Sequence, residues 1–169
     1  MDDAPRPKHR QSAKDRALGL LAVRWRSREE LRRRLRQAGF EADEIERALT
    51  DLTDAGLIED GRFARELVRD QAGRRLAGDR AIRGALRVKG VAADVAENAL
   101  LEAGDEAQRA RELASRRAMR MGSQAPEAAY RRLYGLLVRR GFPSGVAAEA
   151  CRAALAEVFP HTDVETADG

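Results

Sequence analysis

Apolar residues recur along this chain at helical spacing in three stretches, and each stretch ends at a glycine. The segment "LRQAGF" at 35–40 matches "LRVKGV" at 86–91 and "LVRRGF" at 137–142, so that Gly39, Gly90 and Gly141 stand 51 residues apart. Leucines four residues before each glycine, and Leu or Ile one turn earlier, form one apolar face. This pattern predicts an internal repeat in which a short helix ends at a left-handed glycine.

Each repeat is predicted to hold three helices. The helix that ends at glycine is preceded by one periodic stretch and followed by another, with these apolar positions: Ala17, Leu18, Leu21 and Trp25, then Ile45, Leu49 and Leu52; Phe63, Leu67 and Val68, then Val95 and Leu100; Ala110, Leu113 and Ala114, then Val146 and Leu155. No stretch shows the alternation of a strand over even five residues. Ser27 is predicted to cap the first glycine-ended helix with Glu30 in a capping box, and Gly78 takes the matching place.

These elements predict an all-α fold, an elongated curved array of three tandem three-helix repeats with about nine short helices, because such repeats bury their apolar faces mainly against neighbours. We expect repeats at 13–56, 57–104 and 105–159, between disordered polar tails at 1–12 and 160–169. No apolar run approaches the length of a signal peptide or a membrane span. We therefore expect a cytoplasmic protein that does not enter a membrane, and a monomer.

Charge follows the repeat. Residues 6–39 carry 12 basic and 3 acidic side chains, whereas residues 41–60 carry 1 and 8. The same alternation recurs in the other two repeats, within a chain whose formal net charge is only +4. Basic helices before each glycine, followed by an acidic helix, predict a basic stripe along the array.

The stripe supplies the candidate binding residues. Arg32 and Arg36 recur 51 residues later as Arg83 and Arg87, each next to a core position, which leaves the guanidinium free to meet a carboxylate or a phosphate. The full candidate set for a partner or DNA is Arg24, Arg26, Arg32, Arg33, Arg36, Arg74, Arg75, Arg80, Arg83, Arg87, Lys89, Arg131, Arg132, Arg139 and Arg140. The alternative for any one arginine is a solvated face that the acidic helices neutralise through ion pairs.

Catalytic chemistry has few candidates. His9 and His161 both fall in the predicted tails, and Cys151 aligns with Leu49 and Leu100 as a small buried apolar residue. No phosphate-binding glycine loop or cluster of metal ligands occurs in the sequence. Trp25 could stack on a base, but its helical spacing from Leu18 and Leu21 favours a core position. We expect no enzyme activity, no cofactor and no metal.

The order of motifs resembles the RecX family of regulatory proteins, modulators of the RecA recombinase. The resemblance covers 13–156 and is carried by "RSREELRRRLRQAGF", "LTDAGLIEDGRFARELVRD", "GDRAIRGALRVKGV" and "LLVRRGF". In "DGRFA", Asp60 is placed to cap a helix whose core face starts at Phe63 and Ala64. The resemblance implies a modular helical protein that binds the RecA–single-stranded DNA filament and mainly inhibits ATPase, strand exchange and co-protease activity. It also implies single- or double-stranded DNA as a partner for some members.

Two other readings remain open. A sequence-specific helix-turn-helix protein would carry base-reading residues on one recognition helix, whereas here the helices after each glycine are acidic and oppose a phosphate backbone. A helical scaffold for an acidic peptide would also use a basic stripe.

Overall fold

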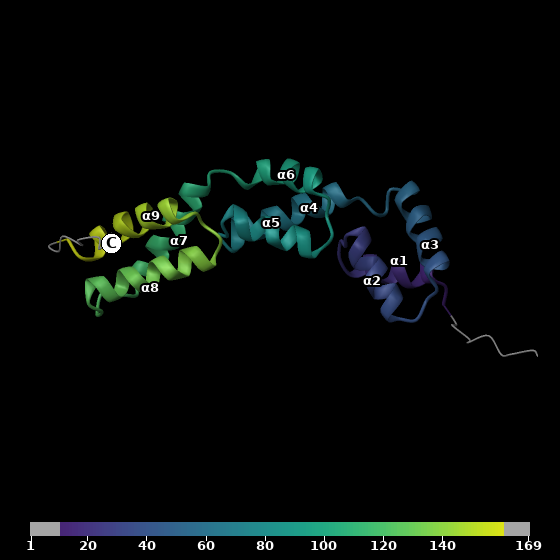
Figure 1. Ribbon diagram of the computed structural model, residues 1–169, viewed down its shortest axis with the longest axis horizontal. Coiled ribbons are helices and arrows are strands. Elements are labelled where there is room, and N and C mark those ends of the chain that lie inside the picture. Colours follow the sequence, from purple (N-terminus) through teal and green to yellow (C-terminus); the bar gives the residue numbers. More distant parts are fainter. Residues whose placement is uncertain (1–10, 161–169) are drawn as a thin grey trace, which may run out of the picture. The chain divides into compact units, whose positions relative to one another are not determined.

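The computed structural model describes residues 11–160, and every regular element in that range is helical. Nine α-helices follow one another within this range in three sets of three (Figure 1). They are α1 (Ala13–Val23), α2 (Arg28–Gln37) and α3 (Ala42–Asp54); α4 (Asp60–Arg69), α5 (Asp79–Val88) and α6 (Ala93–Leu100); α7 (Glu106–Ala118), α8 (Pro126–Arg139) and α9 (Ser144–Val158). A π-helical segment, Asp70–Arg74, extends α4, and a 3-10 turn, Leu101–Ala103, follows α6. The predicted all-α fold of three-helix repeats is confirmed.

The helices belong to two compact bodies. The first body contains the chain up to Phe63 together with Lys89–Val91, and the second contains Ala64–Val88 and the chain from Ala92 onward. The predicted tails fall almost wholly outside the described residues, although Ser12 is described and caps α1 by accepting a hydrogen bond from the Asp15 amide.

The core of the first body comes from α1, α2 and α3. Leu31 and Leu35 of α2 are fully buried in one cluster with Ile45 and Leu49 of α3, and Ala17 of α1 joins them. These are the positions that the helical periodicity selected. Burial of such side chains stabilises the fold by about 1.5–3 kcal/mol each.

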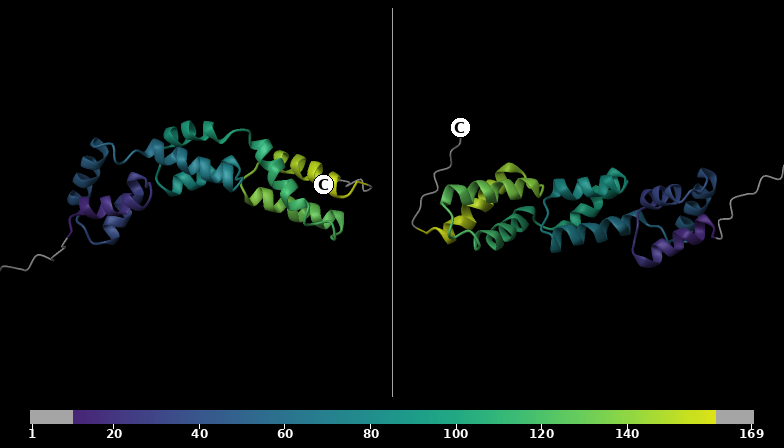
Figure 2. Two further views of the ribbon diagram at one scale, coloured as in Figure 1. Left: turned by 180° about the vertical axis from the view of Figure 1, so that it is seen from behind. Right: turned by 90° about the horizontal axis from the view of Figure 1, so that it is seen from below.

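In the second body, α7 packs against both α8 and α9 (Figure 2). Leu113, Leu137, Phe142 and Leu155 lie in the shared core with Cys151, whose side chain is fully buried. Burial raises the pKa of the Cys151 thiol to about 12. The prediction that this cysteine is a small core residue is confirmed.

The three repeat glycines adopt the predicted left-handed conformation. Their φ angles are +87° at Gly39, +72° at Gly90 and +92° at Gly141, and each follows the last turn of its helix. A side chain would strain this conformation, which accounts for glycine at all three positions.

In the second body the repeat glycine is also needed for close packing. A Cβ atom on Gly141 would lie 2.5 Å from the backbone nitrogen of Ala81, in the first turn of α5. The Gly78 amide, just before α5, donates to the Arg140 carbonyl at 2.9 Å. The backbone after α8 therefore lies directly against the start of α5.

The first body repeats this contact one unit earlier in the sequence. Gly90 lies against Glu29, where a Cβ atom would come within 2.4 Å of the glutamate Cβ. Ser27 caps α2 by accepting from the Glu30 amide, as predicted, and its hydroxyl donates to the Lys89 carbonyl. A serine hydroxyl at one repeat and a glycine amide at the next thus meet the same backbone position.

Three local predictions were wrong: Trp25 and Leu18 are not core residues, and α2 lacks its predicted capping box. Helix α1 ends at Val23, so Trp25 lies beyond it and is 37% exposed, with the Arg62 guanidinium 4.1 Å from its ring centroid. Leu18 is also exposed, at 39%. The extended backbone at Arg24, with φ −166°, breaks the helical spacing that predicted a core position for Trp25, whereas Leu18 lies within α1.

The predicted capping box at α2 is not formed, because the Glu30 carboxylate binds basic side chains instead. Asp60 was predicted to cap α4 but is the first residue of that helix, and Phe63 and Ala64 are buried as predicted. Its Oδ1 accepts from the Arg28 amide at 2.8 Å, so its carboxylate serves the start of α2.

Candidate functional site

The basic residues that repeat in register divide into two kinds. Arg32 binds Glu46 with Nε–Oε1 and Nη2–Oε2 distances of 2.6 and 3.0 Å, and Arg83 binds Glu97 with corresponding distances of 2.7 and 3.0 Å. Both glutamates lie 14 residues after their arginine and 51 residues apart, so the ion pair is itself part of the repeat. The hydrogen bond from Arg32 lowers the pKa of Glu46 to about 2, and the one from Arg83 lowers the pKa of Glu97.

The expectation that all four in-register guanidinium groups are free is therefore wrong for Arg32 and Arg83. Their forks hold the second helix of a repeat to the third. Arg36 and Arg87 match the expectation of a free guanidinium group, because both are exposed and neither side chain has a bonding partner among residues 11–160.

Three more candidates converge on one buried carboxylate, that of Glu30. Arg24, Arg26 and Lys89 all bind it, with a Lys89 Nζ–Oε2 distance of 3.2 Å. Burial of Glu30 opposes its charge, but hydrogen bonds from these three cations outweigh that effect and lower its pKa to about 2. Arg26 is only 7% exposed and its Nε donates to the Leu20 carbonyl, so its assignment to a contact surface is wrong.

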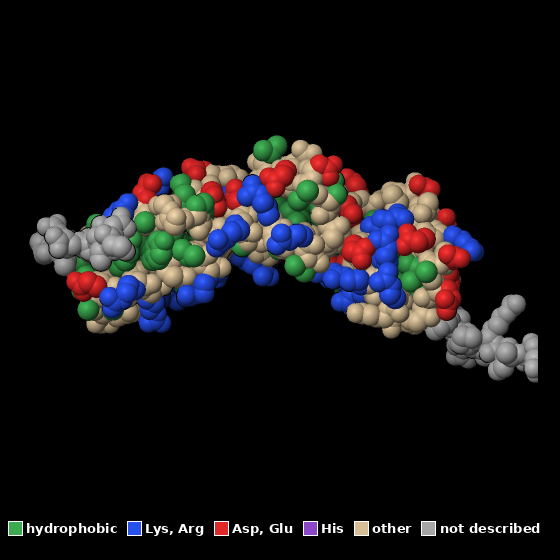
Figure 3. Space-filling view, viewed as in Figure 1, with side chains coloured by type: hydrophobic (Ala, Val, Ile, Leu, Met, Phe, Trp, Pro, Cys, Tyr) green, Lys and Arg blue, Asp and Glu red, His purple; other side chains and the backbone are tan. Residues whose placement is uncertain are grey.

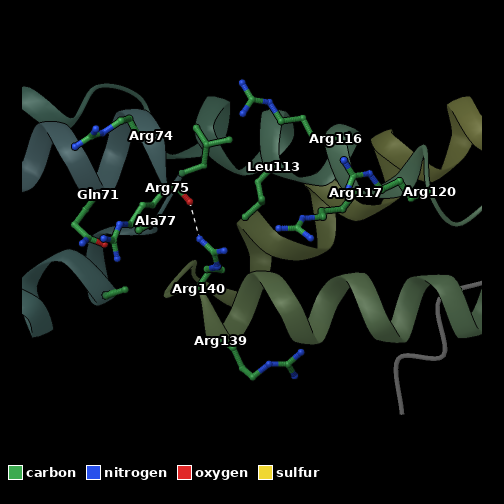
Figure 4. A pocket seen from close by; sticks show the side chains of 12 residues that line it. Gln71, Arg74, Arg75, Ala77, Leu113, Arg116, Arg117, Arg120, Arg139 and Arg140 are labelled. Carbon is green, nitrogen blue, oxygen red and sulfur yellow. Dashed lines mark hydrogen bonds between the residues drawn. The ribbon is translucent and has the colours of Figure 1, made fainter.

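A cavity of about 580 Å³ in the second body gathers the largest group of arginines (Figure 4). We call it the arginine cavity. It is lined by Arg74, Arg75, Arg116, Arg117, Arg120, Arg139 and Arg140, together with Gln71, Leu76, Ala77, Ala81 and Leu113. No carboxylate lines it. Four of the seven arginines were predicted from the sequence, and Arg116 and Arg117 in α7 and Arg120 just after it were missed.

The seven guanidinium groups come from three parts of the chain. Arg74 and Arg75 lie at the end of the π-helical segment, Arg117 and Arg120 lie across the cavity at the end of α7, and Arg140 lies between them (Figure 4). Arg140 Nη1 donates to the Arg75 carbonyl at 2.7 Å, which fixes its position.

The remaining candidates lie on α5, α8 and α2. Arg131 and Arg132 are exposed on α8 without a partner in the described residues, while Arg80 Nη2 donates to the Val138 carbonyl at 3.0 Å. Arg33 lines a smaller cavity of about 240 Å³ beside Glu30. In the second body, basic side chains gather along the lower edge of α8 and over α5, and acidic ones over α6 (Figure 3).

Comparison with known proteins decides the family. The RecX models for the first, second and third three-helix domains match residues 13–52, 60–100 and 104–151. The chain belongs to the RecX family. Regulatory protein RecX of Corynebacterium efficiens is 44% identical over 150 residues, covering 84% of this chain and 71% of that protein. The protein of the same name from Amycolatopsis mediterranei is 38% identical over 147 residues, with 86% and 84% covered.

Solved RecX structures share the fold. The crystal structure of RecX from Lactobacillus salivarius superposes with a TM-score of 0.72 at 24% identity, covering 84% of this chain and 94% of that one. A crystal structure of regulatory protein RecX gives a TM-score of 0.73 at 26% identity, covering 83% and 71%. The arginine cavity of this chain is built from residues of the second and third RecX domains and the linker before α5.

No group of three or more His, Cys, Asp or Glu side chains within 11–160 is placed to hold a metal ion. No helix in that range is both long enough and apolar enough to span a bilayer. His9 and His161 lie outside the described residues. The relatives of this chain are named as regulatory proteins, which fits a role through binding.

Proposed function

We propose that this chain regulates the RecA recombinase by binding the RecA–single-stranded DNA filament and mainly inhibiting its ATPase, strand exchange and co-protease activities. The proposal is carried by membership of the RecX family, whose relatives are named regulatory proteins. It is supported by Arg87, Arg131 and Arg132, which are exposed without a carboxylate partner in the described residues, and by the arginines that line the arginine cavity, all of which can meet acidic protein or phosphate.

The contact residues are revised by the structure. We retain the exposed candidates Arg36, Arg74, Arg75, Arg80, Arg87, Arg131, Arg132 and Arg139 together with the half-buried Arg140, and we add the cavity residues Arg116, Arg117 and Arg120. Arg26 is assigned to the core, and Arg32 and Arg83 to ion pairs between helices. The chain is proposed to act in the cytoplasm, without a cofactor.

A helix-turn-helix repressor is disfavoured by the charge of the helices that follow the first two repeat glycines. The first turn of α3 carries Asp43 and Glu44, and that of α6 carries Asp94, which a phosphate backbone would repel at the place where a recognition helix starts.

The test is DNA-dependent ATP hydrolysis by RecA, measured while this chain is titrated from substoichiometric to equimolar amounts. We expect hydrolysis and strand exchange to fall below equimolar addition. Unchanged rates of both at equimolar addition would refute the proposal. A second titration with RecA omitted and DNA retained measures direct binding to DNA separately.

A further inference from the structure

The arginine cavity concentrates positive charge without internal compensation. Asp70 binds Arg74 and Arg75, and Glu112 binds Arg116, but neither carboxylate lines the cavity. The other four lining arginines have no carboxylate partner among the described residues. Even after pairing, the lining therefore holds an excess of positive charge in one concave space.

The fold explains how these like charges are held together. Arg116 and Arg117 lie in the last turn of α7, with Arg120 just beyond it, and Arg139 and Arg140 lie at the end of α8. Cations at helix C-termini are favoured by the helix dipole. This stabilisation offsets part of the repulsion, and an anion in the cavity would relieve the rest.

The kind of anion follows from the side chains. Guanidinium groups bind phosphate through two parallel hydrogen bonds and are the preferred partners of phosphate oxygens. The arginines extend from Arg74 at one end of the cavity to Arg120 at the other, with Arg140 between them (Figure 4). Such a row matches a series of phosphates better than a single small anion.

The shape and composition of the cavity narrow the ligand further. No aromatic ring lines it, so it offers no stacking platform for bases. With a volume of about 580 Å³, the cavity has room for a short length of a nucleic-acid backbone only. The backbone of one strand can enter such a space, whereas the body of a duplex cannot.

We propose that the arginine cavity binds the phosphodiester backbone of a single nucleic-acid strand, independently of base sequence. This inference deepens the proposed function. It rests on that function in one respect, because the RecA filament would supply the single strand. The α7 arginines make the site distinct from the stripe that the sequence indicated.

The test uses the full chain with RecA absent. Binding of a fluorescent oligothymidine is followed by anisotropy for wild type and for R117Q/R120Q/R139Q, which removes three lining charges that make no bond to other described residues. The matched control is R16Q/R47Q/R152Q, three exposed arginines on α1, α3 and α9 that lie outside the cavity and likewise lack partners in the described range. Thermal melting of both variants verifies folding.

We expect the cavity variant to bind at least about 10-fold more weakly than the control, and the slope of log K against log salt to become shallower by about 2, since each phosphate contact on a single strand contributes about 0.7. An oligomer with a neutral methylphosphonate backbone should not bind. A mixed-sequence oligomer should bind as oligothymidine does, and a duplex should be less affected by the cavity variant.

Three results would overturn the inference: equal loss of affinity in cavity and control variants, tight binding of the neutral oligomer, or a duplex that depends on the cavity as strongly as a single strand. Because RecA is absent, these results are independent of the ATPase assay. A cavity variant that loses strand binding but still inhibits RecA upholds this inference and places the inhibitory contact elsewhere.

Discussion

Replacing Glu30 with glutamine tests whether a buried carboxylate holds the first body together. Glu30 is 4% exposed and forms ion pairs with Arg24, Arg26 and Lys89. Glutamine keeps the shape of the side chain and one acceptor oxygen but removes the negative charge that these three cations share. Arg26, itself buried, is left without a carboxylate. Such uncompensated buried charge is costly.

The size of the effect follows from the pKa. The pKa of Glu30 falls from 4.5 to about 2 in the folded protein, a shift that corresponds to about 3 kcal/mol of stabilisation at neutral pH. Glutamine retains a hydrogen-bond acceptor, so we expect the free energy of unfolding to fall by about 2–3 kcal/mol. Because the folded pKa lies below the unfolded one, the contribution is complete above about pH 4.5 and is lost as pH falls towards about 2.

The assay is urea unfolding followed by tryptophan fluorescence. Trp25 is the single tryptophan and lies in the first body against Arg62, so its signal reports the unfolding of that body. Glu41→Gln is the control, because Glu41 is exposed and makes no side-chain cap to α3. We expect less than about 0.5 kcal/mol for the control.

Two outcomes contradict the reasoning. A Glu30→Gln protein as stable as the Glu41→Gln control at neutral pH would show that the buried carboxylate contributes nothing. A difference between wild type and Glu30→Gln that stays constant down to about pH 2.5 would show that it does not arise from the charge.

Three further outcomes are expected. Gly141→Ala should cost at least twice the roughly 1 kcal/mol expected for Gly56→Ala, because both have positive φ but only Gly141 faces the backbone of α5, and equal melting temperatures would contradict this. Arg36→Gln with Arg87→Gln should change stability by less than about 0.5 kcal/mol while weakening RecA inhibition, and full inhibition by this variant would remove both from the contact surface. Cys151 should react with a thiol reagent only after urea unfolding, because burial raises its pKa to about 12, and rapid labelling of the native protein would refute its burial.

The sequence predicted the helices and core positions well because both depend on local spacing. Leu31, Leu35 and Leu49 are buried where helical periodicity placed them, and the glycines close the helices as their conformational freedom requires. The prediction of a core position for Trp25 was wrong for a local reason as well, because the extended residue after Val23 turns Trp25 away from the core. No residue in the pattern marks that break.

The candidate site was harder to predict because it depends on contacts across helices. Arg32 and Glu46 repeat together 51 residues later as Arg83 and Glu97, and this shared offset was a signal for paired side chains. At the end of α7, Arg116 and Arg120 stand 51 residues after Arg65 and Arg69, which were not selected as candidates either, and Arg117 has Glu66 at its matching position. Only the packing of α7 beside α8 brings them to the cavity.

The start of the second helix gives the repeats a built-in direction. In the first two repeats, the residue just before the second helix is Ser27 or Gly78. Each of these donates a hydrogen bond to the backbone carbonyl of the residue before the next repeat's glycine. In the third repeat the second helix, α8, begins at Pro126, which has no amide hydrogen to donate and whose ring holds φ close to the helical value. A fourth repeat packed on the third would therefore need, before α8, a hydrogen-bond donor of the kind that Ser27 and Gly78 supply, so the array cannot be lengthened simply by adding one more copy.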